Sequence, residues 1–310
     1  MFFLNLPIGI VGLVLVLLLL PDYRSRNTKP LDLVGMILFG SGIALLSYVL
    51  EIFGDHRLSL GEILGLSTLA ISLLVGYGLY ASRTVYPLLD LALFRIRTFS
   101  AAVSGGFFTR LGIGGFPFLL PLLYQVGLGF TPIQSGLLIM PQAIAALATK
   151  FLLPFILARF GYRMVLIGNT VMLGLLMTAF ALIGPDTSVW AIVALGACNG
   201  IVQSLQYTSM NTLVYSDIPQ SRASNASSLS GALQQLSISF GIAAAGLTTV
   251  LFVPQSVRSN PAEFLHGIHE AFVALGTFTV LSSVLFWRLR SQDGGAVSLK
   301  REVRIGGQGA

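Results

Sequence analysis

One arginine, Arg110, lies deep inside an apolar segment where no charge is expected. The segment covers about residues 98–126, and no aspartate or glutamate occurs between Asp90 and Asp186. If the segment crosses a membrane, a charge at that depth costs at least about 2.5 kcal/mol on insertion scales. Such a residue indicates a water-filled cavity. The alternative is an arginine bonded to backbone carbonyls that a nearby kink exposes.

Small residues and prolines share the helical face of Arg110. They are Gly106, Gly114, Pro117 and Pro121, at spacings of four, seven and eleven residues from it. Residues at these spacings lie on one side of a helix. Glycine and proline in membrane helices allow close backbone approach and kinks. The pattern is typical either of tight packing or of a helix that flexes as a gate.

Polar side chains recur at helical spacing in two later apolar segments. In the segment 187–215 they fall at i, i+4 and i+7, and in the segment 222–252 serine and glutamine share one face. Such stripes either join helices by hydrogen bonds or line a path, and two of them on adjacent helices favour the path. A further cation, Lys150, either reaches the membrane surface or lines the same cavity. The candidate cavity residues are Arg110, Lys150, Asn199, Gln203, Gln206, Ser230 and Gln234.

Motifs for other kinds of chemistry do not occur in this sequence. It has no Gly-rich loop ending in Lys-Ser or Lys-Thr for a nucleotide phosphate, and no Ser/His/Asp or His-Glu-x-x-His arrangement in an apolar segment. The single cysteine, Cys198, excludes an internal disulfide framework. His266 and His269 form one His-x-x-His pair, predicted to be a polar pair in a loop and not a metal site. We therefore expect no enzyme activity, no cofactor and no metal.

Nine apolar segments must position the candidate residues. Hydrophobic residues make up 55% of the chain and charged residues 10%, with a mean hydropathy of +0.84, whereas soluble domains have about 25% charged residues. A helix needs about 20 mostly apolar residues to span a bilayer. The sequence therefore predicts an all-α polytopic membrane protein with about nine transmembrane helices. Their predicted ranges are 2–20, 31–51, 61–81, 98–126, 131–158, 163–184, 187–215, 222–252 and 267–290.

The cationic residues alternate between the two sides of these segments. If the loop after the first helix is cytoplasmic, fourteen of them lie inside and only Arg57 and Arg258 lie outside. Such an excess marks the cytoplasmic side of a membrane protein. We expect a cytoplasmic C-terminus whose basic residues either anchor the topology or contact anionic lipid, and no nucleic-acid partner despite the net charge of +6. The inside residues are Arg24, Arg26, Lys29, Arg83, Arg95, Arg97, Arg159, Arg163, Arg222, Arg288, Arg290, Lys300, Arg301 and Arg304.

The predicted helices fall into three blocks. The first helix, 1–20, stands alone, and a two-helix hairpin follows at 31–81. A cytoplasmic linker at 82–97, predicted to lie along the membrane surface, leads to six evenly spaced helices at 98–290. A cytoplasmic tail covers 291–310. Six such helices suggest the repeat of secondary transporters, which is made of two three-helix units.

Several runs of residues resemble a known family. Phe2-Phe3-Leu4-Asn5-Leu6-Pro7 resembles the start of the sixth helix in the fourteen-helix drug:proton antiporters of the major facilitator superfamily, the EmrB/QacA-like group. Leu31-Asp32-Leu33-Val34-Gly35 resembles the opening of that family's seventh helix. Its MdtD and HsrA branch has runs similar to Thr109-Arg110-Leu111-Gly112 and Gln234-Gln235-Leu236-Ser237. The similarity extends to about residue 290.

The resemblance implies a partial major facilitator fold that corresponds to helices six to fourteen. The hairpin matches the two extra helices between the halves, and the six later helices match the C-terminal bundle. Arg159, Gly161 and Arg163 then form the end of the family's cytoplasmic loop motif, whose aspartate is missing here. Helices one to five, with the antiporter signature and the acidic residues expected to carry the proton, have no counterpart. A truncated chain is therefore expected.

The function implied by this resemblance is proton-coupled multidrug efflux in the bacterial inner membrane. The partners would be small amphipathic or cationic solutes, protons and membrane lipid, with either a separate N-terminal half or a second copy of the chain. Two alternatives stay open. One is transport of another small solute, because a fold does not fix its cargo. The other is a truncated or partner half that does not itself transport.

Overall fold

The structure, a computed structural model, describes residues 2–19, 32–53, 59–84, 87–253, 261–290 and 292–294. All regular elements in these ranges are helices, and eight helices are long and apolar enough to cross a membrane. The predicted all-α polytopic class is confirmed. α1 (Phe2–Leu19) is apolar as well, but its Gly9–Leu19 part is shorter than these spans. The chain divides into two compact units, Met1–Asp32 and Leu33–Ala310, and α1 belongs to the first.

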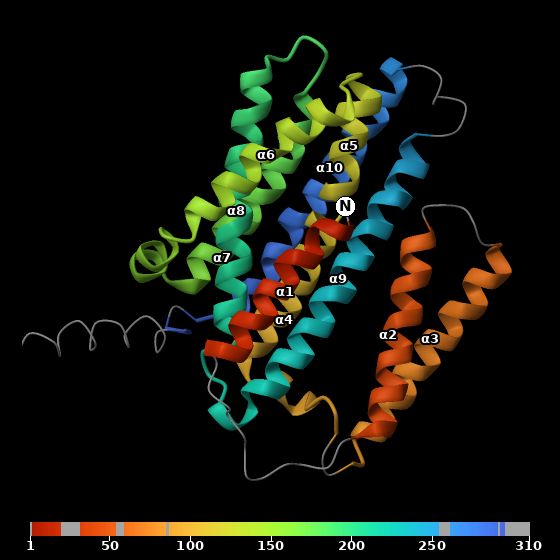
Figure 1. Ribbon diagram of the computed structural model, residues 1–310, viewed down its shortest axis with the longest axis vertical. Helices are drawn as coiled ribbons and strands as arrows, with labels where there is room; N and C mark the ends of the chain where they lie inside the picture. Colours follow the sequence, from red (N-terminus) through yellow and green to blue (C-terminus); the bar gives the residue numbers. More distant parts are fainter. Residues whose placement is uncertain are drawn as a thin grey trace, which may run out of the picture. The chain divides into compact units, whose positions relative to one another are not determined.

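The second unit begins with a helical hairpin. α2 (Leu33–Phe53) and α3 (Leu60–Ala81) pack side by side (Figure 1). Ser59 caps α3: its hydroxyl accepts from the Glu62 backbone N–H at 3.3 Å, and the Glu62 carboxylate accepts from the Ser59 N–H at 2.8 Å. This reciprocal pair satisfies two backbone donors that the helix leaves unpaired, and it fixes where α3 begins.

The linker between the hairpin and the bundle packs against the rest of the second unit and is hydrogen-bonded to it. It contains a short 3₁₀ helix, η1 (Leu91–Arg95), in which Leu93 is fully buried. The backbone N–H of Leu89 donates to the Tyr77 hydroxyl at 2.7 Å. The segment predicted along the membrane surface is therefore partly built into the core. Its role as a domain boundary stays a prediction, because α2 packs on α9 (Ala223–Phe252) within one compact unit.

Six membrane-length segments follow and form the bundle of the second unit (Figure 1). Besides α9, their elements are α4 (Arg97–Ile113), α5 (Phe116–Pro121), η2 (Leu122–Gly127), α6 (Pro132–Thr149), α7 (Leu153–Ala179), η3 (Phe180–Leu182), α8 (Val189–Val214), η4 (Gln220–Arg222), α10 (Pro261–Ser282) and η6 (Ser283–Arg288). α4 contacts α8, α9 and α10, while α6 and α7 both contact α8. Residues on α4 can therefore interact with three neighbouring helices.

The helix predicted over 98–126 is interrupted. α4 ends at Ile113, the chain turns at 114–115, and α5 and a π-helical turn, η2, complete the segment. Pro117 accounts for the break, because it has no N–H to pair with the Ile113 carbonyl and its ring crowds the preceding turn. Arg110 therefore lies in the last turn of α4, immediately before a kink.

The helix predicted over 131–158 is also interrupted. α6 ends just before Lys150, because Pro154 has no N–H to donate to the Lys150 carbonyl. A second break comes at Gly161, whose φ of 71° is accessible to glycine without steric cost. Gly161 lies in the loop predicted between the helices 131–158 and 163–184. That division is confirmed, whereas the turn at Lys150 is a feature that the apolar pattern does not predict.

α10 begins earlier than predicted. The apolar pattern predicts a helix over 267–290 with His266 and His269 in the loop before it, but the helix starts at Pro261. Proline suits the first helical turn because its missing N–H would be unpaired there in any case. The loop prediction for the two histidines is therefore wrong. No group of three or more His, Cys, Asp or Glu residues that could hold a metal occurs in the described part of the chain.

Two apolar clusters fill the second unit, and a polar layer separates them along several helices. On α4 the first cluster includes Phe99 and the second begins at Ile113, and on α7 the corresponding residues are Leu166 and Leu173. The buried polar residues between the clusters include, on α4, α7 and α10, Thr109, Arg110, Thr170, Thr279 and Ser282. We call these residues the polar layer. It places Arg110 about half-way along its membrane-length segment, Arg97–Gly127.

Candidate functional site

The side chain of Arg110 interacts with α8. Arg110 is 5% exposed, and its Nη2 donates to Asn211 Oδ1 at 3.2 Å. The guanidinium carbon lies 5.1 Å from the centre of the Tyr207 ring, a geometry in which the ring face attracts the cation. None of the ion pairs within the described residues includes Arg110. An aromatic ring and a neutral amide therefore hold the charge, and not carbonyls at the kink.

A small pocket opens beside this guanidinium, and we call it the Arg110 pocket. The Asn211 oxygen that accepts from Arg110 also accepts from Gln234 Nε2 at 3.3 Å, and the same nitrogen donates to Ser230 Oγ at 3.0 Å. Apolar side chains, among them Phe107, complete the walls. The free space at its centre is about 10 Å³, roughly the room that one water molecule needs. The pocket can hold one small polar group against the guanidinium.

Gly106 makes room for the Arg110 side chain. A Cβ added at Gly106 would lie 2.7 Å from Arg110 Nη1 and 3.2 Å from Met210 Sδ. Because the nearest atom is the flexible end of an arginine, an alanine here would move the guanidinium and leave the helix intact. The small-residue face predicted beside Arg110 thus has a direct part in placing the charge.

The structure brings together three of the seven predicted cavity residues, namely Arg110, Ser230 and Gln234. Gln203 lies one turn before Tyr207 on α8, and its Oε1 accepts from Gln142 Nε2 of α6 at 3.3 Å. Tyr207 and Asn211 are missed by the sequence reasoning, although they continue the Gln203 row at i+4 and i+8. Extending that polar row by two turns would have found both.

Asn199 and Gln206 are fully buried on a different side of α8. Gln206 Nε2 donates to Thr170 Oγ1 of α7 at 2.8 Å. Neither side-chain polar atom of Asn199 has a hydrogen-bond partner among the described residues. Each step of four residues advances about 40° around a helix, so Asn211 lies about 120° from Asn199. The predicted stripe on α8 therefore splits between two faces.

Lys150 is not a buried cation, and the prediction that it lies in a helix interior is wrong. It is exposed at the C-cap of α6 and does not line the Arg110 pocket. The cause is the turn before Pro154, which takes the Lys150 backbone out of the regular helix. A cation at a helix C-terminus also complements the helix dipole.

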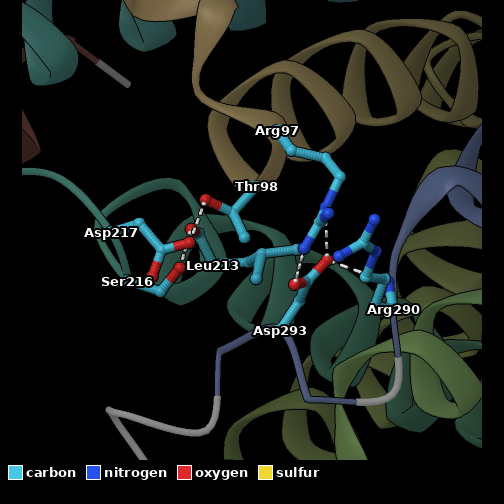
Figure 2. A network of polar contacts seen from close by, with 7 residues as sticks. All are labelled: Arg97, Thr98, Leu213, Ser216, Asp217, Arg290 and Asp293. Carbon is cyan, nitrogen blue, oxygen red and sulfur yellow. Dashed lines mark hydrogen bonds and ion pairs between the residues drawn. The ribbon is translucent and has the colours of Figure 1, made fainter.

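A second polar network lies at the end of the bundle where α4 begins (Figure 2). Arg97 donates to the Asp293 carboxylate through both Nε and Nη2, with 3.0 Å between Nε and Oδ2. Asp293 Oδ2 also accepts from the Arg290 backbone N–H at 2.8 Å. Beside this pair, the Thr98 hydroxyl donates to Asp217 Oδ2 at 2.8 Å. The first turn of α4 is thus tied both to the segment after η6 and to the loop after α8.

The surroundings of the Asp293 carboxyl stabilise its ionised form. Burial alone would raise its pKa, but hydrogen bonds from the Arg97 side chain and the Arg290 N–H, together with both positive charges, lower it overall. The carboxylate is therefore fully ionised at neutral pH. The next residue, Gly294, has a φ of 79° and packs against Tyr162, where a Cβ would come within 2.3 Å of the ring.

Comparison with known sequences settles the family. The sequence model of the Major Facilitator Superfamily matches residues 1–242 and, in a second alignment, residues 102–304. The chain belongs to the major facilitator superfamily. This is a family of transporters, in agreement with the expectation that the chain is not an enzyme.

Several relatives within the superfamily share one name. The chain is 36% identical over 273 residues to a protein of Serratia proteamaculans that is provisionally named multidrug resistance protein MdtD, covering 88% of this chain and 56% of that protein. It is 34% identical over 306 residues to proteins of the same name from Escherichia fergusonii and Escherichia coli, covering 98% of this chain and 64% of each relative. The chain thus spans less than two thirds of the length of these relatives. The resemblance to the drug:proton antiporters and their MdtD branch is confirmed.

The superfamily loop motif predicted at Arg159, Gly161 and Arg163 lies where α7 breaks. Gly161 supplies the break, and both arginines are exposed. Neither arginine forms an ion pair with a described residue. Since the motif's aspartate is missing from the sequence, the cytoplasmic role predicted for these residues stays a prediction.

Proposed function

We propose that this chain is the C-terminal part of a proton-coupled exporter of small amphipathic solutes in the bacterial inner membrane. The observation that carries the proposal is the Arg110 pocket, which puts a buried charge inside a membrane-length segment beside three polar side chains of α8 and α9. Polar groups at this depth are costly and mark transport pathways. The names of the relatives, multidrug resistance proteins, support export.

In this proposal the start of α4 faces the cytoplasm. Arg97, Arg222, Arg288 and Arg290 gather at or near that end of the chain's spans, and the cytoplasmic side of a membrane protein is enriched in cations. The Arg97–Asp293 pair then joins α4 to the C-terminal tail on the cytoplasmic side. Solute would pass the polar layer between this end and the opposite end of the bundle.

The proton-carrying group of the exporter lies outside the central bundle helices in this proposal. No aspartate or glutamate occurs in the sequence between Asp90 and Asp186, between Asp186 and Asp217, or between Asp217 and Glu263. α4 to α9 therefore contain no carboxylate that could exchange a proton at mid-membrane. Alternating access needs two halves that rock about a central site. A separate N-terminal half or a second copy would supply both the acid and the opposite wall.

The test is efflux of a fluorescent dye from cells that express the chain, first alone and then with the five N-terminal helices of an MdtD relative. We expect efflux in the second case, and its loss when an uncoupler dissipates the proton gradient. Arg110→Gln should lower the efflux, whereas Lys150→Gln, which removes an exposed cation, should not. Correctly inserted chain with no efflux in either case would overturn the proposal.

A further inference from the structure

The Arg110 pocket has more hydrogen-bond donors than acceptors. The guanidinium carries five N–H groups, and one hydrogen bond from it, to Asn211, is formed within the described residues. The Asn211 oxygen already accepts twice, and the Ser230 oxygen accepts from Gln234. Two of the three side-chain amide and hydroxyl oxygens of the pocket thus accept hydrogen bonds already, and Gln234 Oε1 is left, while several donors of Arg110 and the Asn211 amide nitrogen remain. A ligand group that only accepts hydrogen bonds would complete the network.

The positive charge of the pocket also favours a ligand group that accepts hydrogen bonds, in particular an anion. Arg110 is buried, and the three helices that line its pocket, α4, α8 and α9, contain no aspartate or glutamate. On α10, which also packs on α4, Glu263 and Glu270 lie in the first half of the helix, before the buried Thr279 and Ser282. A buried cation without a carboxylate is costly, and an anion that enters the pocket removes that cost. The cation–π contact with Tyr207 holds the guanidinium in place but does not neutralise it.

We propose that the Arg110 pocket binds a carboxylate, and that the solutes this transporter prefers carry one. The inference rests on the proposed transport function and adds to it the charge class of the substrate. Arginine forms paired, charge-assisted hydrogen bonds with the two oxygens of a carboxylate. The free space beside the guanidinium, the room of one water molecule, admits one carboxylate oxygen in the place of that water, and the walls at Val103, Phe107 and Leu233 are apolar. A cationic solute would be repelled at this point, contrary to the expectation of cationic substrates.

A carboxylate can reach Arg110 from two sources. It can belong to a solute, which is the source we propose, or to a side chain of the protein half opposite this bundle. The two sources differ in their effect on selectivity. Loss of a solute site lowers binding and transport of anionic solutes alone. Loss of a structural ion pair lowers transport of all solutes by the same factor.

The first measurement is binding of dyes to the purified full chain in a neutral maltoside detergent, by fluorescence anisotropy. Carboxyfluorescein supplies the carboxylate, and rhodamine 6G, a cationic ester, lacks one. We expect carboxyfluorescein to bind more tightly, and Arg110→Gln to weaken its binding by about tenfold or more, the effect of losing charged hydrogen bonds. Binding of rhodamine 6G should stay the same. Lys150→Gln removes an equal charge at an exposed position and should change neither dye.

Gly106→Ala keeps the proposal testable if Arg110→Gln fails to fold. The alanine displaces the guanidinium without removing its charge, so carboxyfluorescein binding should also weaken. Equal affinity of the wild type for both dyes would overturn the inference, and so would carboxyfluorescein binding that neither substitution changes.

The second measurement is efflux of the same two dyes from cells that co-express the N-terminal helices. An equal loss of both dyes in Arg110→Gln would assign the carboxylate to the protein and overturn the solute site. Binding without any efflux would leave the inference intact and defeat the transport proposal. Efflux of rhodamine 6G with no Arg110-dependent binding of carboxyfluorescein would support the transport proposal and overturn the carboxylate site.

Discussion

The ring of Tyr207 lies 5.1 Å from the guanidinium carbon of Arg110 and takes the place of the carboxylate that a buried arginine usually contacts. Tyr207→Leu removes the aromatic face, whereas Tyr207→Phe keeps it. We expect Tyr207→Leu to lower the free energy of unfolding by about 0.5–2 kcal/mol, the range of a cation–π contact. Thermal melting of the purified variants checks this. Equal melting of the two variants would show that the ring contributes only its apolar area.

Arg110 is predicted to lower the stability of the unliganded protein. Its charge is buried without an acidic partner among the described residues, and such a charge costs several kcal/mol before compensation. Arg110→Gln should therefore raise the melting midpoint by a few degrees, a gain of about 1–2 kcal/mol, while solute transport falls. Lys150→Gln is the matched control and should melt like the wild type. A large drop in the midpoint of Arg110→Gln would reveal an acidic partner.

The limits of the helices follow from the sequence more readily than their interruptions. Apolar length places the spans because a bilayer sets it. The turn at Lys150 depends on one missing N–H, that of Pro154, and prolines inside membrane helices are often tolerated without such a turn. The early start of α10 also depends on a proline. The apolar run that predicts the helix begins at residue 267, whereas the backbone is helical from Pro261.

The candidate site is predictable only in part, because it depends on how the helices are rotated. Arg110 is singled out by its cost, and it does line the pocket. Asn211 supplies the central oxygen, and the i+4 row through Gln203 reaches it, but Asn211 lies about 120° from Asn199 on the helix, so the row itself does not show which of its members face α4. Which side of α8 faces α4 and which faces α7 is decided by packing. The sequence pattern does not show which side of α8 faces which neighbour.

The Arg97–Asp293 pair is predicted to lose its contribution at low pH. Since the folded-state pKa of Asp293 is lowered below the ordinary value of about 3.9, the carboxylate stabilises the fold fully above that value. The contribution disappears as pH falls through the folded-state pKa. Asp293→Asn should melt below the wild type at pH 7 by an amount typical of a surface pair, about 0.2–1 kcal/mol.

The measurement for this pair is the melting midpoint of both proteins from pH 7 to pH 3. The difference between them should stay constant down to about pH 5 and then shrink. Arg159→Gln is a control, because Arg159 is exposed and has no ion pair among the described residues. A difference that grows as the pH falls would contradict the assigned direction of the pKa shift.

Asn199 offers the sharpest test of packing around α8. It is fully buried, and neither its amide oxygen nor its amide nitrogen has a partner among the described residues. An unsatisfied buried polar group costs about 1–3 kcal/mol, so Asn199→Ala should raise the melting midpoint even though it leaves a small void. Cys198→Ala, a change at the exposed neighbouring position, should have little effect. If Asn199→Ala melts lower than Cys198→Ala, the amide has a partner that stabilises it, either an internal water or a group that arrives when the transporter changes conformation.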